Sequence, residues 1–280
     1  MNNTIPKTIN IRGELVSLEH PLVMGILNIT PDSFYDKSRN LEYNDALQRA
    51  EQIISEGADI IDVGAYSSRP GAQDISEEEE IERLKTVLPQ IRERYPQTII
   101  SVDTFRSRVA RYAVEECGVD IVNDITGGEG DDQMFSTIAH LKIPYILMHM
   151  RGTPQTMQND TSYHNVMVDI IEYFSKKISE LHQLGVNDII LDPGIGFAKS
   201  LEQNYNIIKN LADFAQFKLP LLVGVSRKSM IYKLFNTSPQ EALPGTVALN
   251  TMALTKGANI LRVHDVRECV ETVRIFELSK

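Results

Sequence analysis

The sequence lacks the features of secreted, membrane-spanning and zinc-bound proteins. Only two of its 280 residues are cysteines, Cys117 and Cys269, and no Cys-x-x-Cys pair or zinc-type Cys/His spacing occurs. Both are expected to be free and buried, which favours a reducing compartment. The N-terminal residues contain no apolar stretch typical of a signal peptide, and no run of about 20 apolar residues could cross a bilayer. We therefore expect a cytoplasmic protein with no membrane partner.

Basic charge is also scarce. The chain has 28 Lys and Arg residues against 38 Asp and Glu, a formal net charge of −10. This balance argues against a nucleic-acid partner, which needs a basic face, although a local cluster of Arg and Lys can still hold a small anion. Internal repeats and interdomain linkers are absent as well. Residues 1–280 are therefore predicted to form one domain, of a length typical of a (β/α)8 barrel.

Short apolar runs and amphipathic stretches alternate along the chain. Eight runs of four to seven residues, rich in Val, Ile and Leu, are typical of parallel strands buried on both faces. They lie at Leu22–Asn28, Ile60–Val63, Thr98–Val102, Asp120–Asn123, Tyr145–His149, Asp188–Leu191, Leu221–Gly224 and Ile260–Val263. Helices are predicted at Tyr43–Glu56, Ser76–Arg94, Val166–Leu184, Leu201–Leu211, Pro244–Lys256 and Val266–Leu278.

Eight strand-then-helix units predict an α/β fold of the (β/α)8 TIM-barrel class. The alternative is an open doubly wound sheet, which usually has fewer strands and a glycine-rich turn after the first strand. Here that turn begins at Asn28 and contains no G-x-G-x-x-G. The segment Thr8–Leu18 is predicted to form a small N-terminal hairpin that closes the bottom of the barrel.

Polar side chains occur at or just after the ends of the predicted strands, where barrel enzymes carry their chemistry. Taken singly, several have structural explanations. Asp62 would serve as a buried structural acid, Asp103, Asn123 and Asp192 as helix N-caps, and His149 or His264 as core histidines. Such side chains at seven or eight consecutive strand ends are poorly explained by caps alone, so we expect a functional site.

The residue types indicate what the site binds. Asp103, Asn123 and Asp192 offer acceptors and an amide, which suit a flat heterocycle whose ring N–H groups need partners. Positive charge near strands seven and eight, where barrels commonly hold phosphate, comes from Lys228, Arg262 and His264. Asn28 offers a neutral oxygen for Mg²⁺, which takes few protein ligands when phosphates complete its shell. A heterocycle, a phosphate or diphosphate, and Mg²⁺ are therefore expected.

The motifs at these strand ends resemble those of the dihydropteroate synthase family. Gly25–Phe34 resembles its first signature, and Gly57–Gly64 with Ser68–Gly71 resembles its second. The similarity continues in order through Ser101–Thr104, Asn123–Ile125, His149–Pro154, Asp192–Phe197, Gly224–Ser229 and Arg262–Asp265. It extends from about residue 20 to the end of the chain.

The resemblance implies a reaction. The substrate would be 6-hydroxymethyl-7,8-dihydropterin diphosphate, and the amine of p-aminobenzoate would attack its exocyclic methylene while diphosphate leaves. The carbon–oxygen bond is expected to break first, leaving a resonance-stabilised cation. Asp103 and Asp192 would then stabilise the cation, whereas Arg262, His264 and Mg²⁺ would stabilise the departing anion.

The resemblance also implies a role for each matched residue. The pterin would be held by Asp103, Asn123, Asp192 and Lys228, with Met148 packing on the ring and Asp62 as a supporting acid. Mg²⁺ would bind at Asn28. The diphosphate would contact Ser68, Arg69, Arg262 and His264, in the motif that includes Val263. The p-aminobenzoate pocket would comprise Phe34, Pro70, Phe197, Lys228 and Ser229. Sulfonamides, which mimic p-aminobenzoate, are expected to inhibit.

The chain departs from the family pattern at three places. Tyr66 replaces an acidic residue, Asp36–Arg39 lacks the usual glycines, and Ala198 replaces a glycine. The loops Thr30–Asn40 and Tyr66–Asp74 flank the predicted mouth, and they are expected to be mobile without substrate and to close over it so that water is excluded.

Three other functions share part of this pattern, and one assembly is expected. A methyltetrahydrofolate methyltransferase with a corrinoid partner shares the pterin-binding residues but releases no anion, so it does not need Lys228, Arg262 and His264. A non-catalytic pterin-binding paralogue would have lost part of the set. A phosphate-sugar aldolase needs a Schiff-base lysine on a strand. A homodimer formed through the last helices is a family expectation, with Leu254, Ile275 and Phe276 as apolar candidates.

Overall fold

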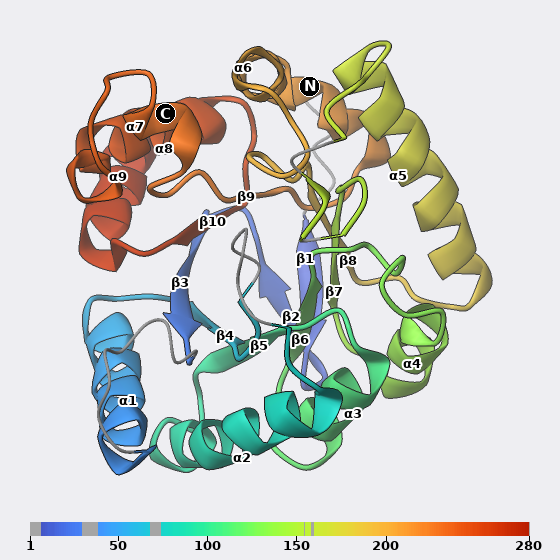
Figure 1. Cartoon of the computed structure of the whole chain (residues 1–280), viewed down its shortest axis with the longest axis vertical. Coiled ribbons are helices and arrows are strands. Elements are labelled where there is room, and N and C mark those ends of the chain that lie inside the picture. Colours follow the sequence, from blue (N-terminus) through green and yellow to red (C-terminus); the bar gives the residue numbers. More distant parts are fainter. Residues whose placement is uncertain (1–6, 30–38, 68–73, 154, 158–159, 280) are drawn as a thin grey trace.

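Eight parallel strands form a closed barrel in this computed structural model, which describes residues 7–29, 39–67, 74–153, 155–157 and 160–279 (Figure 1). The strands are β3 (Leu22–Asn28), β4 (Ile60–Gly64), β5 (Ile99–Asp103), β6 (Ile121–Asp124), β7 (Tyr145–Met148), β8 (Ile189–Asp192), β9 (Leu222–Val223) and β10 (Ile260–Val263). Neighbours in the sequence are neighbours in the sheet, and β10 pairs with both β3 and β9. A parallel bridge between Leu191 and Leu221 joins β8 to the segment before β9 and completes the ring.

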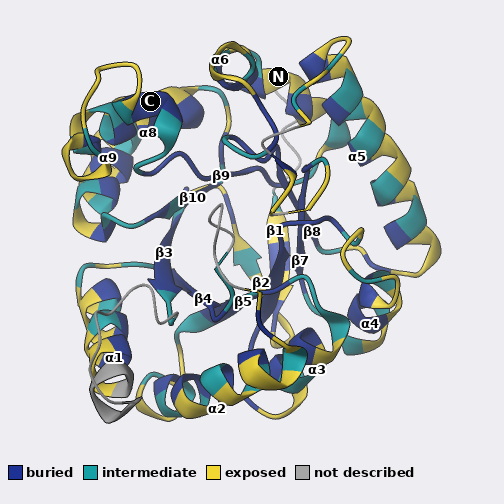
Figure 2. Cartoon of the chain, viewed as in Figure 1, coloured by how far each residue is buried: buried dark blue, intermediate teal, exposed yellow. Residues whose placement is uncertain are grey.

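Helices surround the strands, with their buried sides turned inward (Figures 1 and 2). They are α1 (Arg39–Ser55), α2 (Glu77–Arg94), α3 (Ser107–Glu115), α4 (Met134–Leu141), α5 (Val166–Gln183), α6 (Leu201–Lys209), α7 (Ser229–Tyr232), α8 (Leu243–Thr255) and α9 (Val266–Leu278), with 3-10 turns η3 (Leu211–Phe217) and η4 (Pro239–Glu241). None of the helices among the described residues is long and apolar enough to span a membrane. The eight parallel strands and the helices around them confirm the predicted barrel fold.

The predicted strands agree with the observed ones to within about two residues. β3 and β10 have the predicted bounds, while β5, β6 and β8 begin and end one residue later. The predicted helix at Ser76 is confirmed in detail, since the Ser76 hydroxyl accepts a hydrogen bond from the Glu79 amide at 3.2 Å and four glutamates follow it. The short helices α3 and α4 were not singled out in the sequence. They have only nine and eight residues, a length at which helical periodicity is weak.

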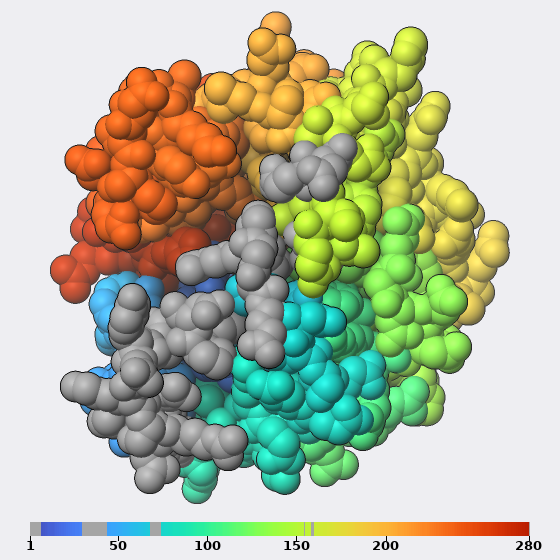
Figure 3. Space-filling view, viewed as in Figure 1, coloured from blue at the N-terminus to red at the C-terminus, as the bar shows by residue number. Residues whose placement is uncertain are grey.

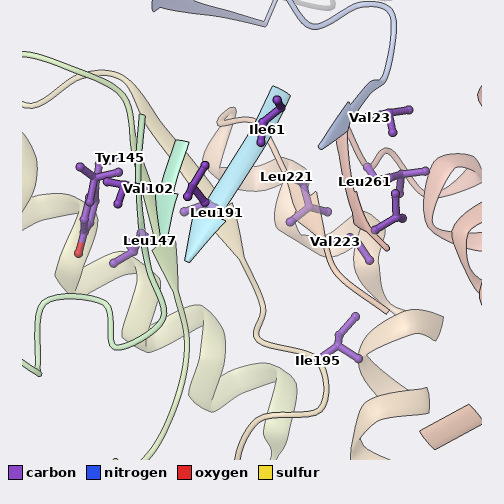
Figure 4. Close-up of a cluster of buried hydrophobic side chains, with 14 of the residues drawn as sticks. Val23, Ile61, Val102, Tyr145, Leu147, Leu191, Ile195, Leu221, Val223 and Leu261 are labelled. Carbon is purple, nitrogen blue, oxygen red and sulfur yellow. The ribbon is translucent and has the colours of Figure 1, made fainter. Parts of the chain in front are cut away.

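The main core lies between the strands and the helices. Along each strand alternate side chains point outward, as Figure 4 illustrates with Ile61, Val102, Leu147 and Leu261 from four different strands. These residues are 0% exposed and meet the apolar sides of the helices. Cys117 and Cys269 are free and buried in the same core, as predicted.

An antiparallel hairpin closes the amino-terminal end of the barrel. Its strands are β1 (Thr8–Ile11) and β2 (Glu14–Ser17), so the predicted hairpin is confirmed. Its buried side chains Ile9, Ile11 and Leu18 form one cluster with inward-facing residues near the starts of the barrel strands: Met24, Ile60, Ile121, Ile146, Ile190, Leu222 and Ile260. Burying a side chain of this kind contributes about 1.5–3 kcal/mol, so this end of the barrel is a dry, stabilising layer.

Candidate active site

The layer above this apolar cluster is polar. Strand side chains alternate with a period of two, so the residue two positions after an inward-facing one also faces inward. Two positions after Ile60, Ile121, Ile146, Ile190 and Ile260 come Asp62, Asn123, Met148, Asp192 and Arg262. The same period carries β3 from Met24 to Asn28 and β5 from Ile99 to Asp103. The strand alternation therefore brings most of the predicted site residues together at the carboxyl-terminal mouth.

Arg262 joins two of the predicted acids. Its Nε lies 2.6 Å from Asp62 Oδ2, and its Nη2 lies 2.6 Å from Asp103 Oδ2. The Asn123 amide donates a hydrogen bond of 3.0 Å to the same oxygen of Asp62. Asp62 is buried, and its second oxygen, Oδ1, is buried and has no hydrogen-bond partner among the residues that the structure describes. A buried carboxylate oxygen without a partner is costly, so this atom is suited to accept a hydrogen bond from a ligand.

The protonation of Asp103 is shifted by this arrangement. Burial raises the pKa of Asp103 to about 7. The attraction of Arg262 opposes the rise, and the repulsion of Asp62 adds to it. Strongly shifted carboxyls in a barrel mouth are typical of functional sites.

Asp192 and Lys228 lie on the opposite side of the mouth from Asp62. Asp192 Oδ1 accepts a hydrogen bond of 2.8 Å from the Gly194 amide, and burial raises the pKa of Asp192 while the charge of Lys228 opposes the rise. Burial lowers the pKa of Lys228 to about 8, against the attraction of Asp192. The Lys228 ammonium donates to the carbonyl of Ile195 and lies 4.6 Å from the centre of the Phe197 ring. A carboxylate, an ammonium and an aromatic face thus share one wall.

An apolar surface adjoins these polar groups. Met148 is buried in a small cluster with Ile125, Met150, Met157 and Ala198, and the partly buried rings of Phe105 and Phe197 pack against it. Met148 ends β7, and the other members come from the loops after β5, β6, β7 and β8, so the cluster lies at the mouth. A flat ring could stack here while its edge meets acids and amides.

The remaining described site residues lie around the same opening. Asn28 ends β3 beside Gly64, and Ser229 begins α7 next to Lys228. His264 follows β10, and its backbone amide and its Nδ1 each lie 3.1 Å from the Ser226 hydroxyl. Val263 is fully buried in the main core, so its side chain does not face the mouth. Its place in the motif reflects the barrel core rather than a side-chain contact with a ligand.

Four predicted contacts lie outside the described residues: Phe34, Ser68, Arg69 and Pro70. The prediction of closing loops at Thr30–Asn40 and Tyr66–Asp74 falls largely on the same segments, as does the glycine-poor departure at Asp36. Figure 3 shows the face of the molecule on which the orange segment that contains α7 and α8 lies across from the cyan segment that contains α2 and α3.

The strand-end residues that had a possible structural explanation differ in their observed roles. The N-cap positions of α3, α4 and α6 are occupied by Arg106, Gln133 and Ser200, so Asp103, Asn123 and Asp192 do not cap the helices that follow them. His149, in contrast, is a core histidine. It is 2% exposed and contacts Lys199 and the Tyr173 ring.

Two groups of interacting residues were not found from the sequence. The first surrounds Tyr66, whose ring meets Phe105 edge-on at 5.0 Å with the Arg106 guanidinium 5.2 Å away, while Gln155 donates a hydrogen bond to its hydroxyl. This residue therefore links the loops after β4, β5 and β7, a role that the acidic family residue could not fill by ring packing. The second group surrounds the buried side chain of Lys199. Neither has a pattern in the sequence, because the partners are loop residues far apart in the chain.

Carboxylates, an amide, two cations and an apolar surface lie together at the mouth of a (β/α)8 barrel. This set defines an enzyme-type site for a polar heterocycle with an anionic group. Residues 24–264 match the pterin binding enzyme family. The chain is 44% identical over 270 residues to dihydropteroate synthase of Escherichia coli strain K12, covering 96% of this chain and 95% of the relative. The chain belongs to the pterin binding enzymes and, within them, to the dihydropteroate synthases.

Solved structures agree with the sequence relatives. The Yersinia pestis dihydropteroate synthase in a sulfonamide drug complex superposes with a TM-score of 0.91 at 40% identity, covering 97% of this chain and 98% of that one. The Xanthomonas albilineans dihydropteroate synthase with 4-aminobenzoic acid gives a TM-score of 0.91 at 31% identity, covering 98% of both chains. The alternative of an open doubly wound sheet is therefore excluded.

Proposed function

We propose that this protein is a transferase that joins 6-hydroxymethyl-7,8-dihydropterin diphosphate to p-aminobenzoate, giving 7,8-dihydropteroate and diphosphate. The observation that carries the proposal is the polar layer at the barrel mouth. It presents Asp62, Asp103, Asn123 and Asp192 around an apolar surface, as a heterocycle with several ring N–H groups requires. Asp62 Oδ1 provides one buried acceptor that no described part of the protein uses.

In the reaction, the amine nitrogen of p-aminobenzoate forms a bond to the exocyclic methylene carbon. The carbon–oxygen bond to diphosphate breaks with its electron pair, and the nitrogen loses one proton. Asp103 and Asp192 face the positive charge that develops on the pterin, while Lys228 and Arg262 provide positive charge in the same mouth. Phe197 and Ser229 adjoin Lys228, where the second substrate would lie.

Mg²⁺ is proposed as the metal cofactor, with Asn28 as its protein ligand. A side chain on Gly64 would lie 3.4 Å from Asn28 Oδ1 and 3.4 Å from Asp103 Cβ, so the bare glycine leaves room beside that oxygen. No group of three or more His, Cys, Asp or Glu side chains suited to a metal occurs among the described residues. This fits an ion held by one neutral oxygen, with diphosphate oxygens and water completing its shell. When bound, Mg²⁺ would neutralise charge on the diphosphate.

The test is formation of dihydropteroate by the purified protein given pterin diphosphate, p-aminobenzoate and Mg²⁺, with diphosphate release measured in parallel. Release that requires p-aminobenzoate, and that is largely lost in Asp103→Ala and Lys228→Ala, supports the proposal. Binding of the pterin by well-folded protein without turnover would instead indicate a non-catalytic pterin-binding paralogue. Methyl transfer from methyltetrahydrofolate to a corrinoid would indicate the methyltransferase.

Three expectations about the protein's surroundings accompany this proposal. The relatives solved with a sulfonamide drug and with 4-aminobenzoic acid support small-molecule substrates and sulfonamide inhibition. The two free, buried cysteines support a cytoplasmic location. A homodimer through the last helices is supported by Ile275, which is 70% exposed, whereas Leu254 is 3% exposed and Phe276 packs against the core. Light scattering of the purified protein would measure its mass in solution.

A further inference from the structure

The loop after β8 is held from inside by a buried lysine. Lys199 is 5% exposed, and its ammonium lies 2.9 Å from the carbonyl oxygen of Gly194, 3.0 Å from that of Phe197 and 3.2 Å from that of His149. Its fourth neighbour is His149 Nδ1 at 3.1 Å. Carbonyl oxygens only accept, so the lysine nitrogen donates to each of these three carbonyls. Burial lowers the pKa of Lys199 well below its ordinary value.

These contacts couple the state of the histidine to that of the lysine. His149 Nδ1 accepts from a charged lysine, with the ring proton on Nε2, and it donates to the lone pair of a neutral one. Burial lowers the pKa of His149 to about 2, and the charges of Lys199 and Arg151 lower it further. The ring stays neutral, packed edge-on against Tyr173 at 4.9 Å. The loop after β7 and the loop after β8 are thus joined through one cation.

The backbone is shaped to let Lys199 enter. Gly194 has a φ of +66°, and a side chain there would lie 2.0 Å from the His149 carbonyl oxygen and 3.2 Å from the lysine ammonium. Ala198 is fully buried and has a φ of +49°, in the left-handed region that costs a non-glycine residue roughly 1–2 kcal/mol. The strained residue stands directly before the lysine, which indicates that the inward course of the chain is maintained by the contacts of Lys199.

The held loop carries two residues of the proposed site. Asp192 binds the Gly194 amide at 2.8 Å, and the Phe197 amide binds the Gly194 carbonyl at 3.1 Å. Lys199 binds that same Gly194 carbonyl and the Phe197 carbonyl. One side chain therefore fixes the turn between a carboxylate expected on the pterin and a ring expected on p-aminobenzoate.

We propose that Lys199 is a positioning residue for the synthase reaction: through His149, Gly194 and Phe197 it sets the relative placement of Asp192 and Phe197. The inference depends on the proposed function, because it assigns these two residues to the two substrates. It separates Lys199 from Lys228, which donates to Ile195 on the same loop beside the Phe197 ring and is placed in contact with substrates.

The test compares Lys199→Met with Arg92→Met. Arg92 is also a cation that donates hydrogen bonds to three carbonyl oxygens, those of Pro96, Thr98 and Gly118, and it is partly buried. It lies with Asp120 at the opposite end of the barrel. Displacing reacting groups by about 1 Å can cost on the order of a hundredfold in rate. We expect Lys199→Met to raise the KM for p-aminobenzoate and lower kcat by at least ~10-fold each. Arg92→Met should keep both within about twofold at a comparable loss of thermal stability.

Two further measurements keep the inference testable if Lys199→Met does not fold. Lys199→Gln retains two donors and should give kinetic constants between those of the wild type and the methionine variant. His149→Phe keeps a ring against Tyr173 but removes the acceptor, and it should change the same constants in the same direction by a smaller factor. In the wild type, nitrogen NMR should find the His149 ring neutral from pH 5 to 9.

The outcomes distinguish the two proposals. A wild-type protein that forms no dihydropteroate contradicts the proposed function. A wild-type protein that is active, with Lys199 variants that lose stability yet keep both constants within about twofold, overturns the positioning role alone. A His149 ring that titrates near its usual pKa also overturns it.

Discussion

The two ends of this barrel are made from the same strands and have opposite character. At the amino-terminal end, inward-facing residues such as Ile60 and Ile260 meet the hairpin residues Ile9 and Leu18 in a dry cluster. At the carboxyl-terminal end, two residues further along the same strands, Asp62 and Arg262 lie in a polar layer with shifted pKa values nearby.

Charges occur at both ends, but they are used differently. Asp120 at the bottom is bound by Arg12 at 3.2 Å and by Arg92 at 2.6 Å, and it also accepts the Ile100 amide, so its oxygens are fully used by the protein. Asp62 at the mouth keeps one buried oxygen that has no partner within the described ranges of the chain. A satisfied ion pair fixes structure, whereas an incompletely satisfied one is available to a ligand. The amino-terminal end of the barrel therefore stabilises the fold, and the carboxyl-terminal end is suited to ligand binding.

The largest expected effect comes from removing one buried arginine at each end of the barrel. Arg262→Met leaves Asp62 and Asp103 without their shared cation, and Arg92→Met removes one of the two cations of Asp120. Removing one partner of a buried ion pair typically costs about 3–5 kcal/mol, and less where a second cation remains. We expect the larger loss in Arg262→Met, measured by urea unfolding, together with loss of dihydropteroate formation. Arg92→Met should lose stability and keep activity.

Loss of activity in folded Arg92→Met, or full activity in Arg262→Met, would contradict the division. Dihydropteroate formation should be measured at a temperature well below the unfolding midpoint of both variants, so that the unfolded fraction does not contribute.

The pH dependence of stability gives the next effect. Burial raises the pKa of Asp103 to about 7, above the roughly 3.9 expected in the unfolded chain. Between these two values the folded state binds the extra proton, so this group makes stability fall as pH rises from about 4 to about 7, with no further change above. Asp103→Asn cannot titrate. The free energy of unfolding of the wild type relative to Asp103→Asn should therefore decrease from pH 5 to pH 8.

The contradicting outcome concerns the same pair of proteins. A difference in stability between the wild type and Asp103→Asn that stays constant from pH 5 to pH 8 would place the folded-state pKa of Asp103 at or below its unfolded value. The polar layer would then be a set of ordinary ion pairs.

The smallest effect concerns the strained residue before Lys199. Ala198→Gly relieves a left-handed conformation worth roughly 1–2 kcal/mol and loses a buried methyl group worth about 0.8 kcal/mol. The two nearly offset, so the free energy of unfolding should change by less than about 1 kcal/mol and both kinetic constants should be kept. Thermal unfolding with steady-state kinetics measures this. A loss above ~2 kcal/mol would mean that the methyl group has a packing role that its conformation does not reveal.

The fold and most of the site could be predicted because both depend on short-range patterns. The short apolar runs placed β3 and β10 correctly, and the positions of Asp62, Asn123 and Asp192 in or at the ends of predicted strands assigned them to the barrel mouth. The helices α3 and α4 have only nine and eight residues, so their helical periodicity was too weak to predict them.

Contacts between loops were beyond such patterns. Nothing near Lys199 in the sequence indicates that its ammonium lies on the His149 carbonyl, 50 positions earlier, because the closure of the barrel brings them together. The packing of Tyr66 on Phe105 depends in the same way on the adjacency of β4 and β5. The pairing of Arg262 with two acids was equally hidden, and the sequence instead suggested diphosphate contact for it.

The most direct test of the central claim is a crystal structure of the protein with pterin diphosphate and Mg²⁺. The account predicts the pterin ring at the carboxyl-terminal mouth, stacked on Met148, with Asp103, Asn123 and Asp192 within hydrogen-bond distance of its edge and Asp62 Oδ1 now partnered. A pterin bound elsewhere, or at the mouth with these three side chains more than about 4 Å from its ring nitrogens, would contradict the account.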